Sequence, residues 1–177
     1  MDSLKKYEVW FITGSQHLYG EEVLQQVQKH SAAIAAGLDS SPEMPVSVVF
    51  RPVVKTPEEI YAVCQEANVS SNCIGVITWM HTFSPAKMWI RGLSILQPPI
   101  LHFHTQFNSD IPWDDIDMNF MNLNQSAHGD REFGFMMSRM RLNRKVVTGH
   151  WQQQDVAKEI GRWTRAAAAW KDWQGAK

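Results

Sequence analysis

The sequence predicts an α/β protein in which five parallel strands form one sheet, in the order 2-1-3-4-5, with helices on both faces. Short apolar runs alternate with segments of helical periodicity along the whole chain, and no repeat or flexible linker interrupts them. Strands that alternate with helices form βαβ units, whose right-handed crossovers make neighbouring strands parallel. The length of 177 residues and the 44% of hydrophobic residues suit one domain with a sizeable core.

The first half of the chain predicts two strands and two helices. Residues 7–13 and 46–50 are apolar runs of strand length, whereas residues 21–37 between them repeat apolar side chains at helical spacing. The second helix is expected to begin at Thr56, which can cap it and is followed by a proline, a favoured residue in the first turn. Glu59 completes the pattern of a capping box, in which its carboxylate reaches back to the N–H of the capping residue.

The second half continues the alternation. A helix is expected to open at Ser84, and a long polar stretch, residues 105–124, is expected to connect the fourth strand to the next helix. The final helix carries apolar residues spaced four, three, four and three apart, from Val156 to Trp170, which predicts a stripe that faces the sheet. The remaining elements are expected as strands at 73–79, 100–104 and 145–149 and as helices at 126–142 and 152–173. Five strands and this order are typical of a flavodoxin-like, doubly wound domain.

The composition argues against several classes of function. Lys and Arg number 17 and Asp and Glu number 18, so no basic excess exists to neutralise the phosphates of a nucleic acid. No apolar run approaches the roughly 18 residues of a membrane span, and the first residues lack the hydrophobic segment of a signal peptide. We therefore expect a cytoplasmic protein that binds neither nucleic acid nor membrane. Cys64 and Cys73 lie in apolar segments and are expected in the core rather than in a disulfide.

The loops at 14–20 and 80–83 form the candidate ligand site. In an open parallel sheet, ligands bind beyond the carboxyl ends of the strands, where the strand order reverses, and in the predicted order that point lies between the first and third strands. The loops carry amides, hydroxyls, imidazoles and aromatic rings, with no carboxylate before Glu21. Such groups favour a neutral, polyhydroxylated ligand. A purely structural loop packed by Tyr19 is the alternative.

The turn at 13–15 has another interpretation, as a phosphate or flavin site. Its backbone N–H groups precede a helix, and such groups bind anions. The segment carries neither the G-x-x-x-x-G-K-[ST] nor the G-x-G-x-x-G pattern of nucleotide sites, and no acidic pair ends the first strand as in a receiver domain. A non-catalytic, flavodoxin-like module that binds sugar or flavin is therefore the alternative function.

Three histidines lie inside predicted elements. His102 and His104 share one side of the fourth strand, since alternate residues of a strand face the same way. Paired imidazoles bind zinc or manganese, but two ligands are too few, and no nearby Cys or Glu completes a set. We therefore expect hydrogen-bonded structural histidines there, and no metal. His30 lies on the apolar face of its helix and is expected in the core.

Five sequence blocks resemble L-arabinose isomerases. The blocks follow one another in the family's order and cover nearly the whole chain, so together they are specific. The first is GSQHLYG at residues 14–20, directly after the apolar strand VWFIT. The others are WMHTFSPAKMW (79–89), HFHTQ (102–106), MNLNQSAHGDRE (121–132) and VTGHW (147–151).

The resemblance implies an aldose–ketose isomerase that interconverts L-arabinose and L-ribulose, often with conversion of D-galactose to D-tagatose as a side activity. It also implies a divalent metal, usually Mn²⁺, held by two glutamates and two histidines, and a reaction through an ene-diol. Family members are much longer and carry these ligands downstream. Residues 1–177 are therefore expected to be a single N-terminal α/β domain, with strands and helices to about residue 149 and a closing helix at 152–173. Alone, this domain is expected to be inactive, with no catalytic residue and no metal.

The resemblance also implies where sugar contacts this domain, and that the protein is a homo-oligomer, a hexamer in this family. Gln125 and His128 lie three residues apart at a helix start, away from the switch point, and are expected to serve the site of a neighbouring subunit. The apolar stretch at 133–140 is expected to cover that partner. The residues carried over as substrate-binding, rather than as proton-transfer groups, are Gln16, Leu18, Tyr19, Phe83, Gln125 and His128.

Overall fold

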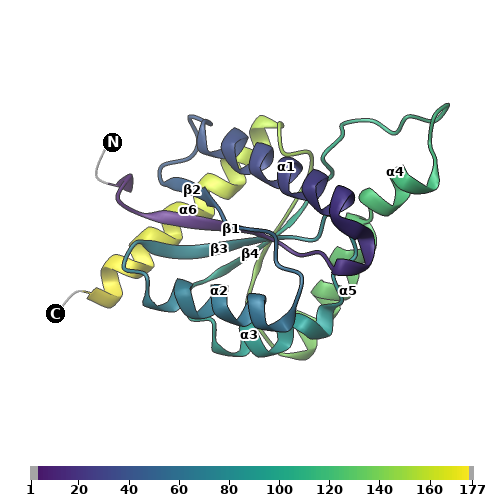
Figure 1. Ribbon diagram of the computed structural model, residues 1–177. Coiled ribbons are helices and arrows are strands. Elements are labelled where there is room, and N and C mark those ends of the chain that lie inside the picture. The colour runs from purple at the N-terminus through teal and green to yellow at the C-terminus, as the bar shows by residue number, and fades with distance from the viewer. Residues whose placement is uncertain (1–3, 176–177) are drawn as a thin grey trace.

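A computed structural model of the protein describes residues 4–175. Its centre is a sheet in which five parallel strands lie in the order β2-β1-β3-β4-β5, so the predicted topology is confirmed (Figure 1). The point at which the strand order reverses lies between β1 and β3, as expected. The strands are β1 (Glu8–Thr13), β2 (Ser47–Phe50), β3 (Cys73–Trp79), β4 (Ile100–His104) and β5 (Lys145–Thr148).

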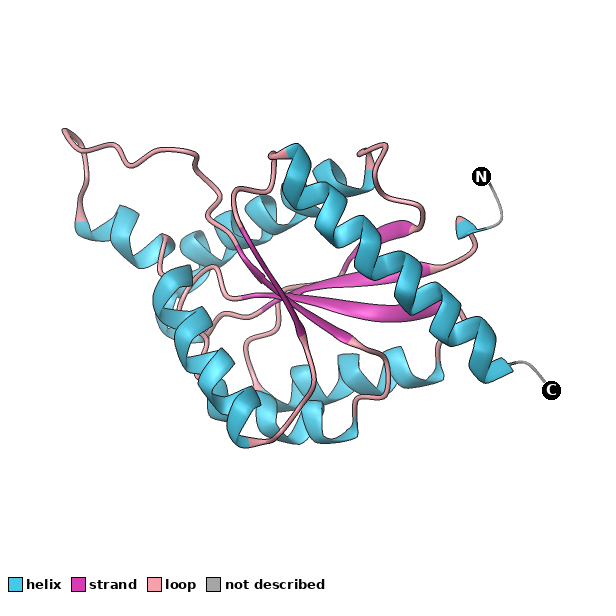
Figure 2. Cartoon of the chain, turned by 180° about the vertical axis from the view of Figure 1, so that it is seen from behind, coloured by secondary structure: helices cyan, strands magenta, loops and turns pink. Residues whose placement is uncertain are grey.

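Helices cover both faces of this sheet, as Figures 1 and 2 show. Helices α1 and α6 pack on one face, and α2, α3 and α5 pack on the other. No helix within residues 4–175 combines the length and the apolar composition that a membrane crossing requires. The helices are η2 (His17–Tyr19), α1 (Gly20–Asp39), α2 (Pro57–Val69), η3 (Ala86–Trp89), α3 (Ile90–Ile95), α4 (Met118–Leu123), α5 (Ser126–Arg139) and α6 (Gln154–Gly175).

The pleat of the sheet sorts the strand residues into two apolar clusters. Phe11 and Trp79 pack in the cluster of α1 and α6. Trp10 and Val76 point the other way, into the cluster of α2, α3 and α5, because successive residues of a strand face opposite sides. Every residue of β3 is buried, which is typical of a parallel strand covered on both faces. Burying each large apolar side chain contributes about 1.5–3 kcal/mol, so these two clusters hold the domain together.

Both cysteines belong to the second cluster, as the sequence predicts. Cys64 and Cys73 are buried and free. Burial raises the pKa of the Cys64 thiol to about 12 and that of Cys73 to about 11, because a thiolate is poorly solvated in an apolar environment. Both side chains are therefore neutral packing groups rather than nucleophiles.

The start of α2 differs from the predicted capping box in one contact. Thr56 is the N-cap, and its Oγ1 accepts a hydrogen bond from the N–H of Glu59 at 3.2 Å, as expected. The Glu59 carboxylate, however, accepts from the N–H of Lys55 at 2.5 Å rather than from that of Thr56. The extended backbone at Thr56 places the preceding N–H within reach, so the box closes one residue earlier than predicted.

The connection at 105–124 contains a helix that the sequence analysis did not predict. The segment leaves the body of the domain and returns to it, and α4 forms on the way back (Figures 1 and 2). Asp117 caps α4 by accepting the N–H of Phe120 at 2.7 Å. A helix of six residues makes fewer than two turns, so no periodic apolar stripe marks it in the sequence.

The apolar stripe of α6 faces the sheet from Val156 to Ala168 but not in the last turns of the helix. Val156, Ile160 and Ala167 are buried as predicted, but Trp170 is 49% exposed, so its expected inward position is wrong. The last turns of α6 continue beyond the ends of the strands (Figure 2), where no sheet remains to cover them. The ring of Trp170 stacks instead on that of Trp173, with centroids 5.0 Å apart.

The close approach of α6 to a neighbouring loop yields a test of this packing. A Cβ added at Gly161 would lie 2.3 Å from the carbonyl oxygen of Glu43, a backbone atom that cannot rotate away. Gly161→Ala is therefore expected to lower the free energy of unfolding by about 1–3 kcal/mol, measured by urea denaturation. Gly175→Ala, in the same helix with nothing within 4 Å of the added carbon, is the control and should change it by less than about 0.5 kcal/mol. Equal effects of the two changes would contradict the packing described.

Candidate functional site

The two loops at the switch point lie against each other, as the strand order predicts. The hydroxyls of Ser15, after β1, and Thr82, after β3, are 2.7 Å apart. The N–H of Phe83 donates to the hydroxyl of Tyr19 at 3.1 Å, which ties the second loop to the end of η2. The candidate site therefore has a rigid floor made of both loops.

The turn after β1 does not offer its N–H groups to a phosphate. The N–H of Gly14 donates to the carbonyl of Trp79 at 3.1 Å, and that of Ser15 donates to the carbonyl of Val54 at 2.9 Å. The hydroxyl of Ser15 is taken by Thr82, and both side chains are fully buried. The two N–H groups that the flavin or phosphate interpretation requires therefore already donate to carbonyls of the protein and are not available to an anion.

A stack of aromatic side chains packs against these loops. His81 is fully buried, and the centroid of its ring lies 4.2 Å from that of Trp79. A ring nitrogen of His81 also shares a 2.8 Å hydrogen bond with a ring nitrogen of His30 of α1. His30 stacks in turn on Phe107 at 3.7 Å between ring centroids. Burial lowers the pKa of His81 to about 3, with a further contribution from His30, and burial also lowers the pKa of His30. Both imidazoles are therefore neutral at physiological pH and join α1 to the β3 loop. His30 is half-buried rather than fully in the core.

The start of α5 reaches the switch point, although the sequence analysis placed it elsewhere. The N–H of Gln125 donates to the carbonyl of His81 at 3.0 Å, and the rings of His128 and Phe83 have centroids 5.0 Å apart. A Cβ added at Gly129 would lie 2.9 Å from that of Met80, so only glycine allows this approach. The expectation that Gln125 and His128 lie away from the switch point is wrong, because the excursion at 105–124 brings the chain back beside β3.

The six residues carried over from the resemblance therefore form one connected strip, which we call the lip. Tyr19 bonds to Phe83, Phe83 contacts His128, and Gln125 lies one helical turn before His128. At the other end, Gln16 is the half-buried N-cap of η2, and its side chain makes no capping hydrogen bond. The lip consists of Gln16, Leu18, Tyr19, Phe83, Gln125 and His128.

Leu18 and His128 are the exposed residues of the lip. The side chain of Leu18 is 85% exposed, whereas Gln16, Tyr19, Phe83 and Gln125 are half-buried. Leu18 therefore belongs to the surface and not to either apolar cluster.

A large cavity lies beside the lip, beyond the ends of β4 and β5. Its volume is about 1210 Å³, and Gln125 and His128 belong to both the cavity wall and the lip. The strand order predicts a cleft between β1 and β3 and gives no indication of this second cavity. Its signal in the sequence is that two neighbouring strands, β4 and β5, end in polar residues, His104 and Thr148. Polar and charged groups on the cavity wall include His104, Gln106, Asn122, Gln125, His128, Arg131, Thr148 and His150.

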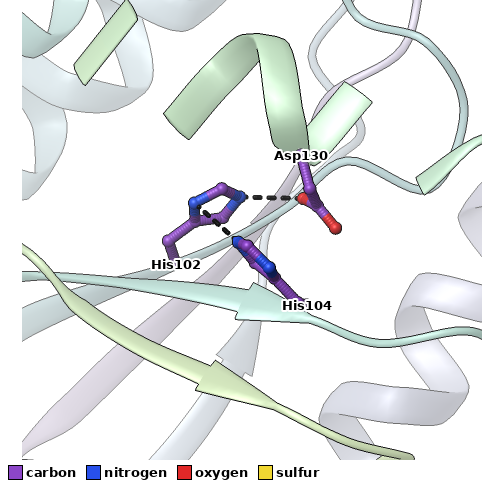
Figure 3. A group of neighbouring side chains, drawn as sticks. All are labelled: His102, His104 and Asp130. Carbon is purple, nitrogen blue, oxygen red and sulfur yellow. Dashed lines mark hydrogen bonds and ion pairs between the residues drawn. The ribbon is translucent and has the colours of Figure 1, made fainter. Parts of the chain in front are cut away.

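A buried polar cluster borders this cavity, and Figure 3 shows its three side chains. Leu101 and Phe103 of β4 face α1 and α6, so the alternate residues His102 and His104 face α5. There His102 Nε2 lies 2.8 Å from Asp130 Oδ1, and His102 Nδ1 lies 3.1 Å from His104 Nε2. His102 is fully buried and Asp130 is 4% exposed, while His104 and Asp130 reach the cavity wall. The pairing of the two histidines was predicted, but their partner on α5, 28 residues away, was not.

The buried pair in this cluster, His102 and Asp130, carries no net charge. Burial raises the pKa of Asp130 to about 8, and burial lowers the pKa of His102 to about 3, helped by the nearby His104 and Arg144. Both shifts disfavour isolated charges, so one proton is shared across the 2.8 Å contact and the pair is neutral as a whole at physiological pH. Burial and Arg144 also lower the pKa of His104.

This cluster does not fit the metal that the resemblance implies. That metal is expected between two glutamates and two histidines, whereas the cluster offers two histidines and one aspartate. Among residues 4–175, these three are the only group of His, Cys, Asp and Glu whose donor atoms come close enough to hold an ion. We therefore assign no reaction step of the family's Mn²⁺ to this chain.

Comparison with known proteins agrees with the geometry. The family described as L-arabinose isomerase N-terminal domain matches residues 3–175. The chain is 69% identical to the L-arabinose isomerase of Herpetosiphon aurantiacus, 63% to that of Koribacter versatilis and 59% to that of Flavobacterium johnsoniae. Each comparison covers the whole of this chain but 35% of the relative's length. The chain therefore belongs to the L-arabinose isomerase family, in which it matches the N-terminal domain.

Proposed function

We propose that this chain supplies the sugar-facing lip of an L-arabinose isomerase, a cytoplasmic enzyme that interconverts L-arabinose and L-ribulose. The observation that carries the proposal is the contact between the start of α5 and the switch-point loops. This contact places the ring centroids of Phe83 and His128 5.0 Å apart. Residues from three distant sequence blocks thereby form one strip. The relatives named above carry this activity in their names, and they are 59–69% identical to the chain.

The chemistry of the lip suits a neutral sugar. The amides of Gln16 and Gln125 can donate to and accept from sugar hydroxyls, and the rings of Phe83 and His128 can cover the C–H surface of the carbon chain. None of the six residues is a carboxylate, so the lip binds and orients the substrate and excludes water from it. The Mn²⁺ implied by the family, when bound, polarises the sugar carbonyl, and we expect its ligands outside this chain.

We also propose that the protein is a homo-oligomer, a hexamer as the family implies. Several large apolar side chains are exposed on the 105–124 excursion and on the outer side of α5. Within the apolar stretch at 133–140, Phe133, Met136 and Met137 pack inside this domain, so that part of the expected partner surface is wrong. The remaining exposed residues, which we propose contact a neighbouring subunit, are Ile111, Trp113, Ile116, Met118, Met121 and Phe135. That His128 and Gln125 serve the neighbour's site stays a prediction.

The first prediction concerns activity. Purified from a host without isomerase, the 177-residue chain is expected to form no L-ribulose from L-arabinose with Mn²⁺ present, because residues 4–175 hold no set of two glutamates and two histidines. A chimera in which this chain replaces the matched 35% of the Herpetosiphon aurantiacus relative is expected to form the ketose. Metal-dependent turnover by the chain alone, or a folded but inactive chimera, would contradict the proposal.

The second prediction concerns the lip. In the active chimera, Gln16→Ala removes a polar contact worth about 0.5–1.5 kcal/mol, so kcat/KM should fall about two- to tenfold while the melting temperature barely moves. Gln28→Ala, on the exposed side of α1, is the matched control and should leave both values unchanged. A large loss of stability with normal kinetics would show that Gln16 is structural.

The third prediction concerns assembly. Trp113 is 77% exposed on the excursion, so Trp113→Ser should weaken subunit association of the chimera and shift its mass toward smaller species on dilution. Val69, which is 85% exposed on α2, provides the control, because Val69→Ser should leave the mass distribution unchanged. Light scattering over a dilution series measures both. Association unaffected by Trp113→Ser would remove the excursion from the interface.

A further inference from the structure

We propose that His102, His104 and Asp130 form a binding site for a late first-row transition metal ion such as Zn²⁺. One donor atom from each of the three side chains lies within 4.8 Å of the donor atoms of the other two. Figure 3 shows the two imidazoles and the carboxylate turned toward one another. The proposal concerns these three residues alone and does not depend on the isomerase activity.

The hydrogen bonds of the cluster show that its donor atoms lie close together, with Asp130 at Nε2 of His102 and His104 at Nδ1 of the same ring. The contacts of 2.8 Å and 3.1 Å are each made between two atoms that are metal ligands when unprotonated, a ring nitrogen with a carboxylate oxygen and a ring nitrogen with a ring nitrogen. Ligand atoms on one tetrahedral Zn²⁺ lie about 3.3 Å apart, since each bond is about 2.0–2.1 Å long. An ion bound to one nitrogen of His102 therefore replaces one of these two hydrogen bonds, and the remaining ligand reaches the ion by rotation of its side chain, because one donor atom of each residue lies within 4.8 Å of the others.

The surrounding structure holds these side chains in place. His102 and His104 come from one strand of the sheet centre, and Asp130 comes from the first turns of α5, which packs directly on that strand. The ring of His102 packs edge-on against Phe133, with centroids 4.9 Å apart. A Cβ added at Gly134, one turn after Asp130, would lie 3.7 Å from His102 Cε1, an ordinary van der Waals contact, so α5 also packs closely on this imidazole there. A site built on a strand and a helix is more rigid than one built on loops.

The donor set selects the kind of ion. Two imidazoles and one carboxylate match the ligands of three-residue zinc sites, which keep a further position for water. Mg²⁺ and Ca²⁺ prefer oxygen ligands and are therefore poor candidates. His104 and Asp130 also line the cavity, so the water on the bound ion is expected to face that cavity, on the same wall as Gln125 and His128.

One nearby charge opposes the ion. The guanidinium of Arg144 lowers the pKa of both His102 and His104, which means that it is close enough to repel a cation. Neutral imidazole is nevertheless the form that binds metal, whereas the buried Asp130 carboxyl must release its proton to solvent when the ion binds. Arg144 therefore limits the affinity of the site without blocking it.

The test uses the tag-free 177-residue chain, stripped with a chelator and titrated with Zn²⁺ by calorimetry. We expect one saturable equivalent, and we expect excess Mg²⁺ not to compete. His104→Asn removes a ligand at the half-buried edge of the cluster and should abolish this binding. Asp130→Asn replaces a carboxylate ligand by an amide and should weaken it by more than about tenfold, since even the loss of an outer-shell partner costs about that much. His150→Asn removes another imidazole from the same cavity wall and is the control that should bind as the unmodified chain does.

The outcomes distinguish a specific metal site from nonspecific binding of the ion by surface histidines. Absence of saturable Zn²⁺ binding, or binding by His104→Asn equal to that of the unmodified chain, overturns the proposal. Equal losses in His104→Asn and His150→Asn also overturn it, since they point to diffuse binding in the cavity. Melting curves without metal check that each variant is folded. Because Asp130 is deeply buried and its variant is the one at risk of misfolding, the half-buried His104 variant keeps the test decisive.

Discussion

The structure depends on the burial of a parallel sheet from both sides. All seven residues of β3 are buried, and the pleat sends alternate side chains into two separate apolar clusters. A polar side chain on a central strand therefore has no access to water on either face and must find its partner inside the protein. This constraint explains where the unusual polar contacts of the domain occur.

Two such contacts join the sheet to its helices. At the end of β3, His81 is bonded to His30 of α1, and on β4, His102 is bonded to Asp130 of α5. In both cases burial holds the imidazole in its neutral form, so its pKa lies well below the usual value. The buried carboxyl of Asp130 responds in the opposite direction, with a raised pKa, which leaves the pair without net charge. Both contacts lie near the carboxyl ends of the strands, where they position the loops rather than the core.

The start of α5 links the lip to the cavity. Gln125 and His128 touch the switch-point loops and also line the cavity beyond β4 and β5, while Asp130 in the same turn reaches the histidines of β4. The close packing at Gly129 makes this convergence possible. The lip is rich in amides and aromatic rings and has no carboxylate, and the cavity beside it borders an exposed apolar excursion. These features support the proposed role of the lip as a surface for a neutral sugar.

The sequence by itself determined the strands, their order and the facing of most core residues, although the short helices η2 and α4 were not predicted. The strands and the longer helices depend on local patterns, since the apolar runs of β3 and β4 and the cap at Thr56 each lie within a few residues. The five family blocks likewise supply the predicted lip residues. Only the tertiary structure decided which distant residues meet. His128 joins Phe83, and Asp130 joins His102, because the excursion at 105–124 returns the chain beside β3 and α5 packs on β4 at one particular angle. The spacing of apolar residues in α5 predicts which face of the helix is buried, but it does not predict the angle at which the helix crosses the strand. The polar cluster and the cavity therefore appear only in the folded chain.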